Sequence, residues 1–106
     1  MTIDEYAQWA ATARKPVGDS REQRLAYLVL GLIGEAGELA DSVRKMMRGD
    51  TLDENYLADE LGDTLYHWAC LCTELGHAPL TLLDQRRRNI EARLAARETP
   101  TRSRHG

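Results

Sequence analysis

Apolar residues recur every three or four positions along most of this chain, which is the period of an amphipathic α-helix. The helical patterns cover residues 3–14, 20–47, 53–76 and 79–98. Pro16 follows the first pattern, Asp53 is suited to cap the third, Gly76 ends it, and Pro79 opens the last. No alternating strand pattern competes with these helices, so the sequence predicts an all-α fold.

The two long helices are separated by a short break at Gly49 and Asp50. A connection of about five residues reverses the chain direction, so the two helices are expected to be antiparallel. The predicted fold class is a helical bundle with two long antiparallel helices plus shorter N- and C-terminal helices. A chain of 106 residues has room for one domain, expected over residues 1–98, and residues 99–106, which include Pro100, are expected to form a flexible tail.

The composition, with 42% hydrophobic residues and a net charge of −3, is typical of a soluble globular domain. The longest uncharged stretch of the first half, residues 25–34, is shorter than the roughly 20 residues that cross a bilayer. Asp4 and Glu5 stand where a secretory signal would be basic, so a cytoplasmic protein without membrane contact is expected. Cys70 and Cys72 are two apart on a helix, which favours reduced packing residues over a disulfide.

Charge is distributed unevenly along the chain. Residues 1–83 hold 14 acidic and 7 basic side chains, whereas residues 84–106 hold 3 acids and 7 arginines. This asymmetry suits a ligand that carries its own cation, because carboxylates hold metal ions and arginines hold anionic groups. A solvated charged surface would show the same distribution, and both interpretations stay open at this point.

Four carboxylates border the apolar stripes of the two long helices: Glu35, Glu38, Glu60 and Asp63. Within each pair the residues are three apart and share one helix face. On facing antiparallel helices the pairs would meet, and like charges about 5 Å apart repel by roughly 3 kcal/mol per pair at an effective dielectric near 20. Hard divalent cations relieve this repulsion, and oxygen ligands suit Mg²⁺ or Mn²⁺. These four residues are therefore the predicted metal ligands.

Glycines accompany the acids, with Gly31, Gly34 and Gly37 on the first long helix and Gly62 on the second. Each destabilises a helix by about 1 kcal/mol relative to Ala. Bare backbone could leave space for metal, water and phosphate, or it could allow close contact between helices. The two explanations are compatible.

The acids form a Glu-x-x-Glu pair at residues 34–39 (GEAGEL) and a Glu-x-x-Asp pair at residues 60–65 (ELGDTL). Together with residues 89–97 (NIEARLAAR), this arrangement resembles the MazG-like all-α nucleoside triphosphate pyrophosphohydrolases over most of the chain. The resemblance implies magnesium-dependent hydrolysis of an NTP or dNTP between the α and β phosphates. The products would be a monophosphate and pyrophosphate, and the role would be nucleotide-pool house-cleaning.

The resemblance also implies roles for individual residues. Glu35, Glu38, Glu60 and Asp63 would hold Mg²⁺, with Mn²⁺ as a substitute, and Glu35 and Glu38 would also be catalytic. The substrate phosphates would be bound by Lys45, Asn89, Arg93 and Arg97. Without the resemblance, a favourable charge at a helix C-terminus explains Lys45, and a solvated face explains the arginines.

The sequence departs from the family pattern at Gly34, where some members carry a further Glu as a candidate general base. Glu35, acting through a bound water, and Asp41 are alternatives for that base. Aromatic and amide side chains that could hold a nucleobase are equally good core or interface residues: Tyr6, Gln8, Trp9 and Trp68.

A homodimer or homotetramer is expected, because four helices leave the long apolar stripes partly uncovered and relatives pair their subunits. A di-iron bundle needs two Glu-x-x-His motifs, and the motif at residues 74–77 runs off its helix at Gly76. A non-catalytic module binding a partner or nucleic acid through the arginine-rich C-terminal helix is the main alternative. The acidic body argues against nucleic acid.

Overall fold

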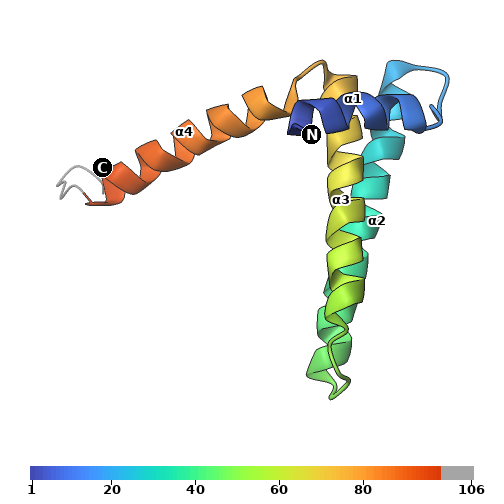
Figure 1. Ribbon diagram of the computed structural model, residues 1–106, viewed down its shortest axis with the longest axis vertical. Helices are drawn as coiled ribbons and strands as arrows, with labels where there is room; N and C mark the ends of the chain where they lie inside the picture. Colours follow the sequence, from blue (N-terminus) through green and yellow to red (C-terminus); the bar gives the residue numbers. More distant parts are fainter. Residues whose placement is uncertain (99–106) are drawn as a thin grey trace.

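The computed structural model describes residues 1–98, and these residues form four helices and no strand (Figure 1). The helices are α1 (Ile3–Ala13), α2 (Arg21–Met47), α3 (Glu54–Leu75) and α4 (Pro79–Glu98). The predicted all-α fold is confirmed, and each helix lies within a few residues of its predicted range. The tail expected at residues 99–106 lies outside the described residues.

Side-chain chemistry explains where the helices begin and end. Ser20 and Asp53 cap α2 and α3 by accepting hydrogen bonds from the backbone N–H groups of Gln23 and Tyr56. The C-cap of α3 is Gly76, whose φ of 82° lies in the left-handed region that favours glycine.

The helices α2 and α3 form an antiparallel hairpin, and α1 crosses the end of the hairpin at which α3 finishes (Figure 1). The core lies at this crossing and consists of Ala10, Leu28, Cys70 and Leu71, with Leu25, Leu32 and Tyr66 packed against them. Both cysteines are buried and free, and burial raises the pKa of both thiols. Their position fits the packing role expected from the sequence.

An ion-pair cluster ties the first three helices together beside this core. One carboxylate oxygen of Glu74, on α3, accepts hydrogen bonds from Arg14 and Arg24 at 3.1 Å each. Arg14 is the C-cap of α1 and Arg24 lies in the first part of α2. Because the Glu74 side chain is only 12% exposed, the cluster is shielded from water.

The glycines of the hairpin differ in their surroundings. A Cβ atom at Gly31 would lie 2.5 Å from Cδ2 of His67, so a larger residue there would require the His67 side chain on α3 to move. Around Gly34, Gly37 and Gly62 there is open space. The His67 side chain thus fills the space beside Gly31, whereas the other three glycines leave bare backbone beside the acidic residues.

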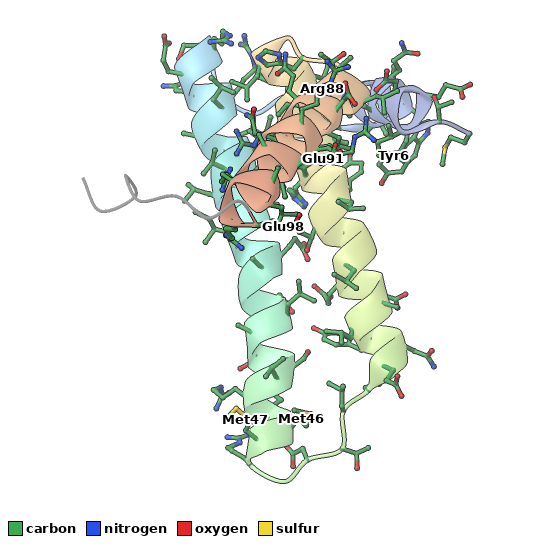
Figure 2. The ribbon with its side chains drawn as sticks, turned by 90° about the vertical axis from the view of Figure 1, so that its left-hand side faces the viewer. Tyr6, Met46, Met47, Arg88, Glu91 and Glu98 are labelled. Atoms are coloured by element: carbon green, nitrogen blue, oxygen red, sulfur yellow. The ribbon has the colours of Figure 1, made fainter. Side chains whose placement is uncertain are left out.

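The described chain is open in shape. Its radius of gyration is 18.1 Å, against about 13 Å for a compact domain of this length. Figure 2 shows the hairpin extending to a tip beside Met46 and Met47 with side chains projecting on both sides. Helix α4 starts beside α1 and α3 and then projects away from the hairpin (Figure 1). The apolar side expected for α4 is therefore exposed at Leu80, Leu83, Ile90 and Leu94.

None of the helices in residues 1–98 combines the length and apolar character needed to span a bilayer.

Candidate metal and substrate site

Three of the four predicted metal ligands meet in the middle of the hairpin. Glu35 projects from α2, and Glu60 and Asp63 project from α3. One carboxylate oxygen from each lies within 4.8 Å of the others. The three-residue spacing on α3 puts its two acids on one helix face, and the antiparallel pairing brings Glu35 opposite them.

Glu60 is the most unusual member of this cluster. It is 8% exposed, and its Oε2 atom is buried with no hydrogen-bond partner among the described residues. Its pKa is raised to about 7, first by a hydrogen bond with Glu35, then by burial and by the negative charges of Glu35, Glu38 and Asp63. A buried carboxylate held among like charges is unfavourable unless a cation compensates it.

The donor set fits a hard divalent cation. All the ligand atoms that converge are carboxylate oxygens, with no histidine or cysteine among them. Mg²⁺ and Mn²⁺ prefer such oxygens and retain coordination positions for water and phosphate. The orphaned Oε2 atom of Glu60 is a further ligand atom that the described protein atoms leave unsatisfied.

Glu38, the fourth predicted ligand, is held slightly apart. Its Oε2 atom accepts a hydrogen bond of 2.7 Å from the hydroxyl of Tyr56 on α3. This hydrogen bond, burial and the nearby acids raise the pKa of Tyr56 to about 12. In the sequence, Tyr56 fits the apolar positions of this helix and does not stand out as a site residue. The available signal was its position four residues before Glu60, which places both on one face of α3.

Two basic residues of α2 are already paired. Asp41 binds Arg44 at 2.6 Å and Lys45 at 3.3 Å. Hydrogen bonds from Arg44 and then Lys45 lower the pKa of Asp41, which makes it a poor proton acceptor. Lys45 thus lies near the acidic face of α2 and shares the single negative charge of Asp41 with Arg44.

The other predicted phosphate ligands, Asn89, Arg93 and Arg97, lie on α4. They are exposed, and α4 has no contact with α2 (Figure 1). Within the described residues, neither Arg93 nor Arg97 forms an ion pair, in contrast to Arg87 and Arg88. A single chain does not bring these three residues to the carboxylates.

A cavity of about 330 Å³ lies between the start of the chain and α3. It is lined by Met1, Thr2, Ile3, Tyr6, Gly62 and Leu65. Gly62 lies between Glu60 and Asp63 in sequence, and the rings of Tyr6 and Trp9 are 5.6 Å apart. Of the four side chains considered for a nucleobase, Tyr6 therefore lines this cavity, whereas Gln8 lines another and Trp68 is half-buried.

Most of the hairpin lies within a region that matches a known protein family. Residues 23–89 match the MazG nucleotide pyrophosphohydrolase domain, a region that contains the four acids of the hairpin. The chain belongs to the MazG family. It is also similar to the gene 37 protein of Mycobacterium phage L5, with 40% identity over 83 residues that cover 71% of this chain and 73% of the phage protein. No solved structure matches it significantly.

Proposed function

We propose that this MazG-family protein is a Mg²⁺-dependent pyrophosphohydrolase that cleaves an NTP or dNTP between the α and β phosphates. Membership of the family supports nucleotide pyrophosphohydrolase chemistry. The observation that carries the metal dependence is the cluster of Glu35, Glu60 and Asp63 around a buried, unpartnered carboxylate oxygen.

The proposed metal ligands are Glu35, Glu60 and Asp63, with Glu38 beside them. When bound, Mg²⁺ or Mn²⁺ supplies positive charge to the phosphate oxygens and lowers the pKa of water. The acids satisfy its preference for oxygen ligands. Binding also relieves the repulsion among them, which adds to the hydrogen bond with Glu35 and to burial in raising the pKa of Glu60. The same carboxylates therefore account both for the repulsion within the site and for its proposed ability to bind a metal ion.

Removal of the proton from the attacking water falls to Glu35 or Glu38. Both lie on α2 at the acidic face, and the open space at Gly34 and Gly37 leaves the backbone around them uncovered. Asp41 is disfavoured because Arg44 and Lys45 stabilise its charged form. The catalytic assignment thus rests on the two glutamates of the Glu-x-x-Glu pair.

Lys45, Asn89, Arg93 and Arg97 are the proposed phosphate ligands. Arginine binds phosphate through paired hydrogen bonds, and asparagine adds a neutral donor. We further propose that the cavity at Tyr6 holds the nucleobase, since an aromatic ring and an apolar lining suit a flat heterocycle. The monophosphate product is not a polymerase substrate, which suits a house-cleaning role in the cytoplasm.

The direct test incubates the protein with Mg²⁺ and a panel of NTPs and dNTPs, followed by product identification. Monophosphate plus pyrophosphate supports the proposal. Diphosphate plus phosphate contradicts cleavage at the α–β bond, and the absence of turnover in a folded protein favours a non-catalytic binding module. Glu60→Gln, which keeps the side-chain shape, should lower kcat by roughly 100-fold or more because metal ligation contributes several kcal/mol.

We also propose that the protein functions as a homo-oligomer, at least a dimer. Large apolar side chains are exposed on every long helix, including Leu30, Ile33, Leu61 and Leu65, which are 51–67% exposed. Large apolar side chains exposed along neighbouring helices are typical of a protein interface. Assembly would cover the hairpin, which in a single chain packs against α1 at one end.

A further inference from the structure

The imidazole ring of His67 lies between α3 and α2, one helical turn away from the carboxylate cluster. An added Cβ atom at Gly31 would be 2.5 Å from Cδ2 and 2.9 Å from Nε2 of this ring, so the ring edge rests on the bare backbone of α2. His67 follows Asp63 by four residues, and Gly31 precedes Glu35 by four. Each therefore lies on the same helix face as its acid, about 6 Å further along the helix axis.

Two contacts within α3 fix the orientation of this ring. Nδ1 of His67 lies 3.0 Å from the carbonyl oxygen of Asp63, and since a carbonyl only accepts, Nδ1 carries the proton and donates it. The ring of Tyr66 meets the imidazole edge-on, with centroids 5.7 Å apart and an angle of 84° between the planes. The His67 ring is thus held by α3 while its outer edge meets α2.

The carboxylate cluster has a contact between the two helices on either side of it. Towards the hairpin tip, the hydroxyl of Tyr56 donates to Glu38, and towards the core, the ring of His67 rests on Gly31. The first contact joins two long side chains, which can adjust to a change in helix separation. The second sets a rigid ring against backbone, with no side chain on α2 that could adjust. His67 is therefore the contact that fixes how closely α2 approaches α3 at Glu35.

The separation of the helices matters because the acids of the cluster come from both of them. Glu35 belongs to α2, Glu60 and Asp63 belong to α3, and one oxygen of each lies within 4.8 Å of the others. Mg²⁺ demands near-ideal octahedral geometry at about 2.0–2.1 Å, whereas Ca²⁺ accepts flexible geometry at about 2.3–2.6 Å. Loosening the separation of the two helices should therefore weaken the binding of Mg²⁺ more than that of Ca²⁺.

We propose that His67 is a positioning residue that sets the spacing of the carboxylate cluster and thereby its preference for Mg²⁺ over Ca²⁺. Its ring, seated on Gly31, keeps Glu35 at a fixed distance from the two acids of α3. The proposal rests on the proposed function, because it takes the three acids as metal ligands. It extends that function by naming a residue outside the cluster that controls which cation fits.

The structure offers a way to displace the ring without removing it. His67 lines a cavity of about 350 Å³ together with Tyr27 and Tyr66, so the ring has space to turn away from α2. In Gly31→Ala the new methyl group would occupy the place of the ring edge and push the ring towards this cavity. Because Ala favours a helix more than Gly does, α2 itself should tolerate the substitution.

Calorimetric titrations with Mg²⁺ and with Ca²⁺, in the absence of nucleotide, test the proposal. His67→Ala should weaken the binding of Mg²⁺ roughly 10-fold and that of Ca²⁺ less than about threefold, so the preference for Mg²⁺ falls. Gly31→Ala should have the same effect. Because both substitutions act through one contact, the double variant should bind Mg²⁺ about as well as either single variant. Independent effects would instead multiply to a loss of about 100-fold.

Two further substitutions separate the ring of His67 from its hydrogen bond. His67→Phe keeps a flat ring against Gly31 without the donor, and its Mg²⁺ affinity should stay within about threefold of the wild type. His67→Asn keeps a donor near the place of Nδ1 without the outer edge of the ring, and it should behave like His67→Ala. The opposite order would overturn the spacing role, because it would make the hydrogen bond to Asp63 responsible for the effect.

The matched control is His77→Ala, which removes the same type of side chain at an exposed position just beyond the end of α3. It should keep both affinities, and a loss of the preference for Mg²⁺ in this variant would contradict a role specific to His67. Melting temperatures in chelator check that each variant is folded. Wild-type preference in folded Gly31→Ala, losses that multiply in the double variant, or an equal loss of both cations in His67→Ala would each overturn the inference.

The titrations also separate this inference from the proposed function. If the wild type binds Mg²⁺ but hydrolyses no nucleotide, the proposed function fails, and the comparison of Mg²⁺ with Ca²⁺ still decides the role of His67. If the wild type hydrolyses nucleotides and every variant keeps the wild-type preference, only the role of His67 is contradicted. If the wild type binds neither cation, the metal site and the inference are both wrong.

Discussion

Glu60 occupies a position that is unfavourable for the stability of the folded protein. A carboxylate that is 8% exposed, beside Glu35 and Asp63, is repelled by its neighbours whenever it is charged. The pKa of Glu60 is raised because protonation allows the hydrogen bond with Glu35, suits the buried position and removes one charge from the cluster. Such strain is expected at functional sites and uncommon in purely structural helix pairs.

This conflict gives an expectation for Glu60→Gln. In chelator at pH 8, where the carboxyl is mostly charged, the variant should have a melting temperature equal to or above that of the wild type. With saturating Mg²⁺ the order should reverse, because ligand binding to the folded state stabilises the wild type by mass action. Thermal denaturation in the two buffers measures both effects. Strong destabilisation of the variant in chelator would make Glu60 a structural partner instead.

Tyr56 is expected to act as a positioning residue for Glu38. Its hydroxyl holds Oε2 at 2.7 Å and leaves Oε1 available. Tyr56→Phe removes this orientation and should weaken Mg²⁺ affinity by roughly 10-fold, as is usual for residues that orient metal ligands. Calorimetric titration with Mg²⁺ measures the change, and Tyr27→Phe, at another half-exposed tyrosine, is the matched control. Unchanged or tighter binding would show that Tyr56 does not prepare Glu38 for the metal.

At the scale of the elements, the helix boundaries could be predicted because their signals are local. Ser20, Asp53 and Gly76 occupy the caps that their side chains and backbone preferences favour. The meeting of Glu35 with Glu60 and Asp63 followed from helical spacing and a short connection. The hydrogen bond between Tyr56 and Glu38 could not be predicted, because it depends on the rotation of α3 against α2 and on side-chain conformation.

Glu74 provides a stability expectation for the junction of α1, α2 and α3. Burial acts to raise its pKa, but hydrogen bonds from Arg14 and Arg24 outweigh burial and lower it. Glu74→Gln should destabilise the protein by about 1–3 kcal/mol, since both arginines lose a charged acceptor in a shielded place. Glu91→Gln, at an ion pair that is 64% exposed on the acid side, should change the stability by less than about 0.5 kcal/mol.

The lowered pKa of Glu74 also determines how the stability of the protein changes with pH. The stabilisation by Glu74 is complete above the unfolded-state pKa of 4.5 and is lost as the pH falls through the lower folded-state value. The difference in unfolding free energy between wild type and Glu74→Gln should therefore shrink between about pH 5 and pH 3. Urea denaturation at several pH values measures it. A difference that stays constant over this range would show that packing, not charge, accounts for Glu74.

At the scale of the whole molecule, the direction of α4 is the feature that the sequence could not provide. Its helical pattern and its arginines are local, but its exit angle depends on the contacts of Leu80 with Asp4 and on the burial of Pro79. The sequence therefore predicted an apolar side for α4 without indicating that the other described residues of the chain would leave it exposed. The exit angle of α4 accounts for the open shape of the described chain and for the exposure of the apolar residues of α4.

If assembly supplies the missing burial, folding and association are coupled. The melting temperature should then rise with protein concentration, because dilution favours the unassembled chain. In that chain the side chains of Leu30 and Ile33 are 67% and 60% exposed. Sedimentation velocity and thermal denaturation over roughly a hundredfold range of concentration measure association and melting together.

Replacing Ile90 and Leu94 by Ser should shift the midpoint of association to higher concentration, since each substitution removes apolar burial worth about 1–3 kcal/mol. Arg86→Ser, on the same helix, is the control for substitution as such. A stable, fully active monomer at micromolar concentration would show that the hairpin and α1 suffice, and that the exposed apolar faces serve another partner.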